Sequence, residues 1–188
     1  MDQDQREEIV RLTTEYGGEW GINHTRRLLR LMEIIGEGLQ YDAEVVWLAA
    51  HLHDWGGYSA WAQPGIDHAL RSKQVAQSFL HEKGYPQSLI APTLECIELH
   101  HQGGSERSIE SILLRDADAL DFLGVVGVLR DFAKQPKDLR KAYESACHRK
   151  DQLVQMIYLE RAQKIAAERI QETESILISF ERETFGLF

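Results

Sequence analysis

The chain has 188 residues and a formal net charge of −9, with 43% hydrophobic and 27% charged residues. This length suits one domain with a sizeable core, and the composition is typical of a soluble globular protein. The acidic balance disfavours binding to nucleic-acid polymers or anionic membranes, and no apolar run is long enough to span a bilayer.

Apolar residues recur at the helical period along nearly the whole chain, which predicts an all-α fold. Gly17-Gly18 is expected to break the first helix, and Asp42 and Asp67 are the expected N-caps of the third and fourth helices. A loop is expected over 56–65, and another break at 103–105. The predicted helices cover residues 4–16, 22–35, 43–53, 68–83, 88–101, 109–133, 138–149 and 151–183.

The organisation predicted from this pattern is a single compact helical bundle over 1–188. Its metal-site core spans about 20–133 and its C-terminal helices about 137–184. No internal repeat or Pro/Ser-rich linker interrupts the chain. The C-terminal third is expected either to wrap the core or to help form a homodimer. The first eight residues lack the basic start and apolar middle of a signal peptide, so a cytoplasmic location is expected.

The most informative pair of residues is His53-Asp54, which follows a run of small and apolar residues. Neighbouring imidazole and carboxylate groups can hold one divalent metal from two directions. Polar groups at the end of a buried helix must be paired or bound to something that offsets their desolvation. The pair therefore marks the expected centre of a site.

Other polar residues fall on the apolar faces of separate helices. A single histidine in such a place is ordinarily a hydrogen-bonded core residue, but a lone buried carboxylate is costly, so the joint pattern favours a metal. Imidazole with carboxylate suits Mn, Fe, Co, Ni or Zn, and Mg with fewer nitrogen ligands. No cysteine cluster is present, because Cys96 and Cys147 are isolated, which argues against a structural zinc site. The residues in this pattern are His24, His53, His68, His100, His101 and Asp118.

The order of these residues resembles the signature of the HD-domain superfamily of metal-dependent phosphohydrolases, over most of the chain. Within that superfamily it is most similar to the small stand-alone bacterial members. Their His-Thr-x-Arg start resembles His24-Thr25-Arg26-Arg27, and their late Asp-Ala-Asp-x-Leu-Asp-x-x-Gly run resembles residues 116–124. The resemblance implies that one metal ion is bound by His24, His53, Asp54 and Asp118.

Subgroups of this superfamily with two metal ions carry additional histidines between the His-Asp pair and the last Asp. His68 matches the first of these, and His100 matches the second, with His101 as the competing choice. Asp54 would then bridge two ions. With only one ion, His68 and His100 would contact the substrate instead.

The resemblance also implies hydrolysis of a phosphate ester by metal-activated water, with Asp54 and Asp118 in the catalytic centre. Arg27 and Lys73 are candidates to hold the phosphate, although each also fits a surface or salt-bridged residue. Asp121 is a candidate to protonate the leaving oxygen, and either Asp121 or Asp116 could orient a ligand imidazole.

The expected substrate is a small phosphorylated metabolite, with a nucleotide as the first choice. Trp55, Tyr58 and Trp61 fit either the floor of a base-binding pocket or ordinary lid packing. One alternative function is that of a mixed-valent di-iron oxygenase, because Tyr16 and Glu19 resemble a pair found before the first histidine of such HD-domain enzymes. The other alternative is a non-catalytic interaction module that retains a metal.

Overall fold

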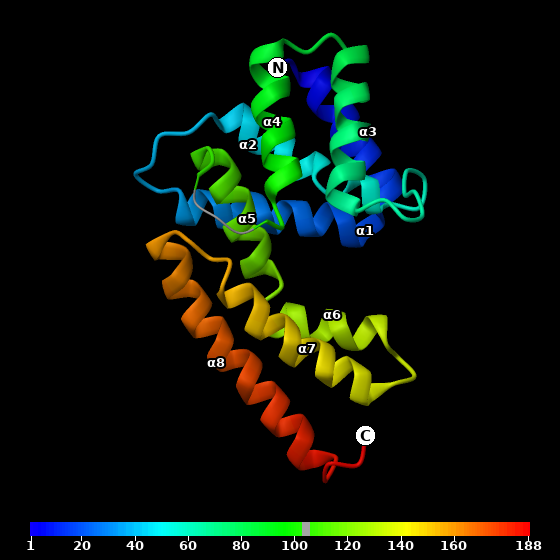
Figure 1. The fold of residues 1–188 in the computed structure, drawn as a ribbon, viewed down its shortest axis with the longest axis vertical. Coiled ribbons are helices and arrows are strands. Elements are labelled where there is room, and N and C mark those ends of the chain that lie inside the picture. The colour runs from blue at the N-terminus through cyan, green and yellow to red at the C-terminus, as the bar shows by residue number, and fades with distance from the viewer. Residues whose placement is uncertain (103–105) are drawn as a thin grey trace. The chain divides into compact units, whose positions relative to one another are not determined.

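The computed structural model describes residues 1–102 and 106–188, and the predicted break at 103–105 lies outside them. Within the described residues the chain forms helices and no strand, so the all-α prediction is confirmed (Figure 1). The elements are α1 (Gln3–Ile35), α2 (Ala43–Leu52), the short 3-10 helix η1 (Trp55–Gly57), α3 (His68–Glu82), α4 (Gln87–Leu99), α5 (Ile109–Asp121), α6 (Val125–Lys134), α7 (Leu139–Val154) and α8 (Glu160–Glu183). Searched over the same described ranges, the helices include none with both the length and the apolar character to cross a membrane.

The chain divides into two compact units, residues 1–115 and 116–188, and α5 runs from the first into the second. The expectation of a single domain over 1–188 stays a prediction. Each unit has its own buried residues.

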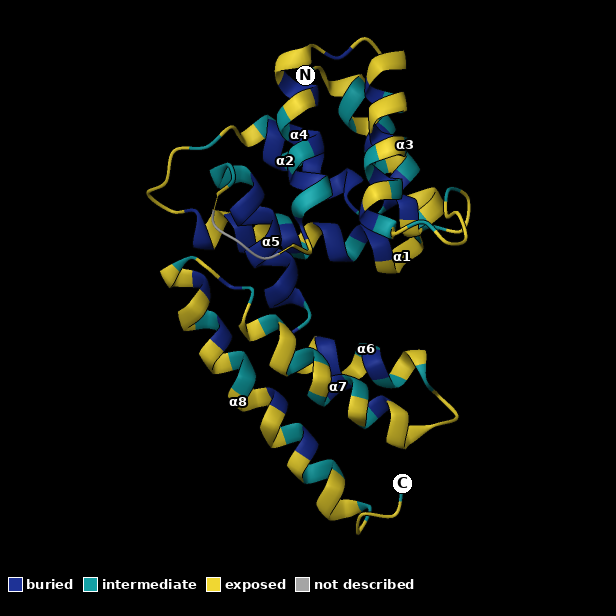
Figure 2. Ribbon diagram, viewed as in Figure 1, coloured by how far each residue is buried: buried dark blue, intermediate teal, exposed yellow. Residues whose placement is uncertain are grey.

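In the first unit, α1 packs against α2, α2 against α4, and α3 against both α4 and η1. The caps predicted from the sequence are present: the Asp42 side chain accepts hydrogen bonds from the first backbone N–H groups of α2, and Asp67 does the same for α3. The predicted break at Gly17-Gly18 is a kink inside α1, where Gly18 has φ +62°. The buried faces of these helices turn toward one another (Figure 2).

Gly56 is the point of closest approach between η1 and α3. Its N–H donates to the Ser72 hydroxyl at 2.8 Å. A Cβ at Gly56 would lie 2.2 Å from the Ser72 nitrogen and 2.7 Å from the His68 carbonyl oxygen, distances that no real Cβ adopts. Only a glycine lets the backbone after Asp54 lie this close to the first turns of α3.

The second unit contains α6, α7 and α8, whose buried residues Val128, Ala146 and Leu177 form a small core. Asp131 is almost fully buried and receives a two-pronged ion pair from Arg149, with the shortest N–O distance at 2.8 Å. This pair ties α6 to α7.

Two helix boundaries in this region differ from the prediction. The expected helix over 109–133 is two helices, because Gly124 adopts φ +79° and its N–H donates to the Thr173 hydroxyl at 2.9 Å. The expected helix over 151–183 begins only at 160, and α7 continues to Val154. The reason is Asp116, whose carboxylate accepts the backbone N–H groups of Tyr158 and Leu159 and so fixes an extended turn before α8.

Candidate metal centre

Two pairs of polar residues stand at the ends of helices in the first unit. His53 is the C-cap of α2 and His100 is the C-cap of α4, and Asp54 and His101 follow them directly. His53 Nδ1 lies 3.0 Å from the Ala50 carbonyl oxygen, and His100 Nδ1 lies 2.6 Å from the Ile97 carbonyl oxygen. Because a carbonyl oxygen only accepts, each Nδ1 carries the proton of this bond, which leaves Nε2 as the nitrogen available to a metal ion.

His24 comes from α1 and meets His53. The two Nε2 atoms lie 3.3 Å apart, and both side chains are 1% exposed. Two nitrogen ligands that each lie about 2.1 Å from an ion and about 90–110° apart are separated by roughly 3.0–3.4 Å. The separation of His24 and His53 therefore fits a shared ion.

The Asp54 carboxylate faces both groups of histidines with different oxygens. Its Oδ2 lies 3.8 Å from His24 Nε2 and 3.6 Å from His53 Nε2, whereas Oδ1 lies 4.0 Å from His68 Nε2. Two ligand atoms of one ion lie roughly 3.0–3.4 Å apart, so a movement of the carboxylate by a few tenths of an ångström would bring its oxygens to such separations.

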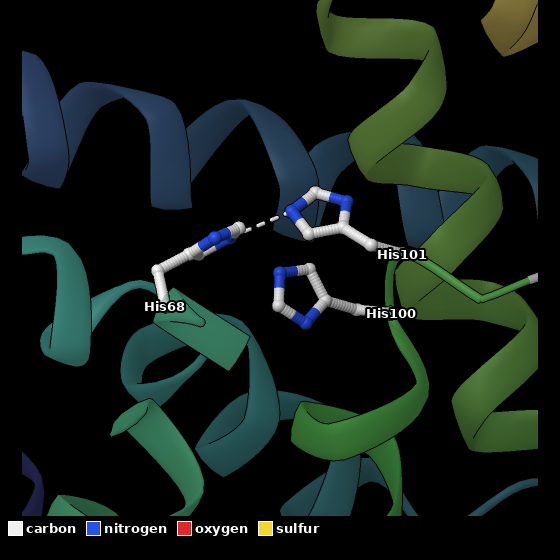
Figure 3. Close-up of side chains that lie close together, drawn as sticks. All are labelled: His68, His100 and His101. Carbon is white, nitrogen blue, oxygen red and sulfur yellow. Dashed lines mark hydrogen bonds between the residues drawn. The ribbon is translucent and has the colours of Figure 1, made fainter. Parts of the chain in front are cut away.

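A second group lies between α3 and the end of α4, where the side chains of His68, His100 and His101 point toward one another (Figure 3). His68 Nε2 and His101 Nε2 are 2.7 Å apart, and one ligand nitrogen of each of the three histidines lies within 4.8 Å of the others. His68 is partly exposed and His101 is exposed, but His100 is fully buried. His100 also belongs to a group with His53 and Asp54, so it lies next to both sets of donors.

These donor atoms suit a divalent metal ion. His24, His53 and His100 place three polar imidazoles in a space where unpaired polar groups are costly, and their nitrogens converge with the Asp54 carboxylate instead of dispersing toward solvent. Imidazole with carboxylate is the donor set of Mn, Fe, Co, Ni or Zn.

Asp118 and Asp121 belong to the second unit, where they are buried on the last turns of α5. The role of Asp118 as a metal ligand and that of Asp121 as a proton carrier stay predictions. Asp116 has the clear structural task described above, since it accepts backbone N–H groups before α8.

The two predicted phosphate-binding cations have other contacts. The Arg27 guanidinium lies over the Trp20 ring at 5.8 Å, and Lys73 Nζ makes an ion pair with Glu98 at 2.7 Å that links α3 to α4. Their roles in substrate binding stay predictions.

The aromatic residues after Asp54 pack together. Trp55 is fully buried and stacks on Trp61 at 4.7 Å between ring centroids, and Tyr16 contacts Trp61 from α1 at 4.5 Å. Trp55 is thus a core residue, while Tyr58 and Trp61 are partly exposed.

Glu19, the other member of the Tyr16–Glu19 pair, accepts a hydrogen bond from Asn23.

His51 is separate from the candidate ligands although it is two residues from His53. Its Nδ1 lies 2.8 Å from the Trp47 carbonyl oxygen, and burial lowers the pKa of His51 to about 4. The imidazole is therefore neutral and structural near pH 7. His81 and His148 are exposed.

In the described part of the chain, the helical fold and the buried histidines around His53-Asp54 define a helical protein with a candidate metal centre. Residues 21–123 match the HD domain family, and the chain belongs to it. The match includes all seven candidate metal ligands, from His24 to Asp118.

Several solved structures share this fold. YpgQ from Bacillus subtilis, solved in complex with ADP, is 23% identical with a TM-score of 0.73, over 96% of this chain and 95% of that one. An HD-superfamily hydrolase from Bacillus thuringiensis is 19% identical with a TM-score of 0.72, over 96% and 97%. A predicted HD-superfamily hydrolase from an uncultured Thermotogales bacterium is 24% identical with a TM-score of 0.63, over 98% and 91%. No curated protein sequence matches the chain significantly.

Proposed function

We propose that the protein is a metal-dependent phosphohydrolase that cleaves a phosphate ester of a small nucleotide or related metabolite. The observation that carries the proposal is the Asp54 carboxylate, whose two oxygens face different histidines, His24 and His53 on one side and His68 on the other. Membership of the HD domain family and the ADP bound to the similar YpgQ support the reaction class and the nucleotide.

His24, His53 and Asp54 would hold one ion, with Asp118 as the predicted further ligand, and His68, His100 and His101 would supply a second. A divalent ion bound there supplies Lewis-acid chemistry, because it acidifies water and offsets charge on the phosphoryl oxygens. The protein's own part is to fix the ligands. The carbonyl groups of Ala50 and Ile97 hold His53 and His100 in the tautomer that presents Nε2 to the centre.

The direct test is replacement of the carboxylate proposed to bridge the two ions, Asp54→Ala. Metal content is measured on protein purified without added metal, and hydrolysis is then screened on a nucleotide panel with Mn, Co, Ni and Mg. We expect Asp54→Ala to lose bound metal and at least 100-fold in turnover, while Asp151→Ala, which removes an exposed carboxylate, keeps both. A metal-free Asp54→Ala protein with full activity would refute the proposal.

The same measurements separate the alternatives. Iron in the purified protein, together with turnover that requires oxygen, would identify the oxygenase. Bound metal without hydrolysis of any substrate in the panel would identify the non-catalytic module.

A further inference from the structure

Tyr58 is held against α1 by two glycines. A Cβ at Gly17 would lie 2.5 Å from the Tyr58 ring carbon Cζ, and a Cβ at Gly21 would lie 2.7 Å from the Tyr58 hydroxyl oxygen. Since any larger residue would displace the phenol, Gly17 and Gly21 form a cradle shaped for this side chain.

The cradle lies one helical turn from the candidate ligand His24. Gly21 and His24 are three residues apart on one face of α1, a rise of about 4.5 Å along the helix. Tyr58 also follows Asp54 by only four residues, in a turn fixed by hydrogen bonds from the Tyr58 N–H to the Trp55 carbonyl and from the Trp61 N–H to the Tyr58 carbonyl. Tyr58 therefore lies against the helix that carries His24 and close enough to Asp54 for the two groups to interact electrostatically.

The Tyr58 hydroxyl is protonated and can donate a hydrogen bond. Burial, and then the negative charge of Asp54, raise the pKa of Tyr58 above the ordinary value for tyrosine, so the phenol keeps its proton at neutral pH. Within residues 1–102 and 106–188, the hydroxyl makes no hydrogen bond to another residue. A half-buried donor of this kind is suited to an oxygen that arrives with a ligand.

We propose that the Tyr58 hydroxyl, oriented by the Gly17–Gly21 cradle, donates a hydrogen bond to a phosphoryl oxygen of the substrate at the His24–His53–Asp54 centre. The proposal rests on the proposed function. It assigns to Tyr58 a contact with the phosphate, in place of the base-binding or lid role suggested by its aromatic ring. A neutral donor with a raised pKa binds the phosphate without transferring its proton.

The test uses Tyr58→Phe, which keeps the ring in the cradle and removes only the hydroxyl. Binding of inorganic phosphate to the full chain loaded with Mn²⁺ is measured by titration calorimetry, together with metal content and thermal unfolding. Because a hydrogen bond to a charged oxygen is lost, we expect phosphate affinity to fall about 10- to 100-fold. Metal content and the unfolding temperature should stay at the wild-type values.

Two further variants complete the test. Tyr85→Phe removes a buried hydroxyl elsewhere in the first unit and should leave phosphate affinity unchanged. Gly21→Ala pushes the ring out of the cradle and should weaken phosphate binding as Tyr58→Phe does.

Wild-type phosphate affinity in metal-loaded Tyr58→Phe would overturn the inference while leaving the proposed function intact. A lower unfolding temperature with wild-type phosphate affinity would assign Tyr58 a packing role only, and would also overturn the inference. If the wild-type protein with metal neither binds phosphate nor hydrolyses any nucleotide, the proposed function fails and the inference fails with it.

Discussion

Gly56→Ala tests whether the close approach of η1 to α3 builds the centre. The new Cβ would lie 2.2 Å from the Ser72 nitrogen, whereas ordinary contacts begin near 3.4 Å, so α3 or the turn must move by more than about 1 Å. Gly56 has an ordinary negative φ, so the penalty is steric and not conformational. Because the obstructing atoms are backbone, no side chain can rotate away.

The magnitude follows from overpacking, which typically costs about 1–3 kcal/mol of unfolding free energy. For a chain of this size, each kcal/mol lowers the unfolding temperature by about 2–4 °C. The displacement also separates His68 from Asp54, whose facing atoms are 4.0 Å apart. We therefore expect loss of metal affinity in addition to loss of stability.

Gly57→Ala is the matched control, because a Cβ on this neighbouring glycine would meet nothing within 4 Å. Thermal unfolding of the metal-free proteins measures the change in unfolding temperature, and titration calorimetry measures the affinity for Mn²⁺. If Gly56→Ala unfolds at the same temperature as Gly57→Ala and binds Mn²⁺ equally well, the close approach does not position the ligands.

Two other predictions concern groups away from the centre. Cys96 is fully buried, and burial raises the pKa of its thiol. Iodoacetamide at pH 8 should therefore label the partly exposed Cys147 first and Cys96 only after unfolding. Equal labelling rates of the two thiols in the native protein would contradict this prediction. Burial raises the pKa of Tyr85 to about 12, while an unfolded tyrosine ionises near pH 10. The stability from this neutral phenol is therefore present below pH 10 and is lost as the pH rises toward 12. In urea unfolding at pH 8 and 11, Tyr85→Phe should lose less stability between the two values than the wild type, and an equal loss would exclude Tyr85 as the cause.

Much of the fold was predictable because its signals are local. Asp42 and Asp67 were correctly predicted as N-caps, since a carboxylate before an apolar helical run satisfies the first free N–H groups. The helix boundaries that were wrong depend on contacts distant in the sequence. The hydroxyl of Thr173 receives the Gly124 N–H, and Asp116 fixes the turn at Tyr158 and Leu159.

The candidate site was predictable as a set of residue types but not as a geometry. Helical spacing and the resemblance to the HD domain family pointed to His24, His53, His68 and His100, and the structure brings these four together with Asp54. The sequence left His100 and His101 as alternatives, because it does not determine in which direction each of two adjacent side chains at a helix end points. The structure places both next to His68.

The role proposed for Tyr58 was not predicted from the sequence for a similar reason. Gly17 was interpreted only as part of a helix break, and no role was predicted for Gly21. No local sequence pattern indicates that a phenol from another segment fills the space these two glycines leave. The available signal was Gly21 itself, a glycine inside a helix and one turn before the candidate ligand His24.

The histidines at the ends of α2 and α4 have a consequence for dynamics. Helix ends ordinarily fray, and their amides exchange with solvent faster than those of helix interiors. Here the last carbonyls are held by His53 and His100, so an ion that immobilises those rings also restrains the terminal turns. Hydrogen exchange at the backbone N–H of His53, which donates to the Ala49 carbonyl at 3.0 Å, would then report occupancy of the centre directly, in the absence of any substrate.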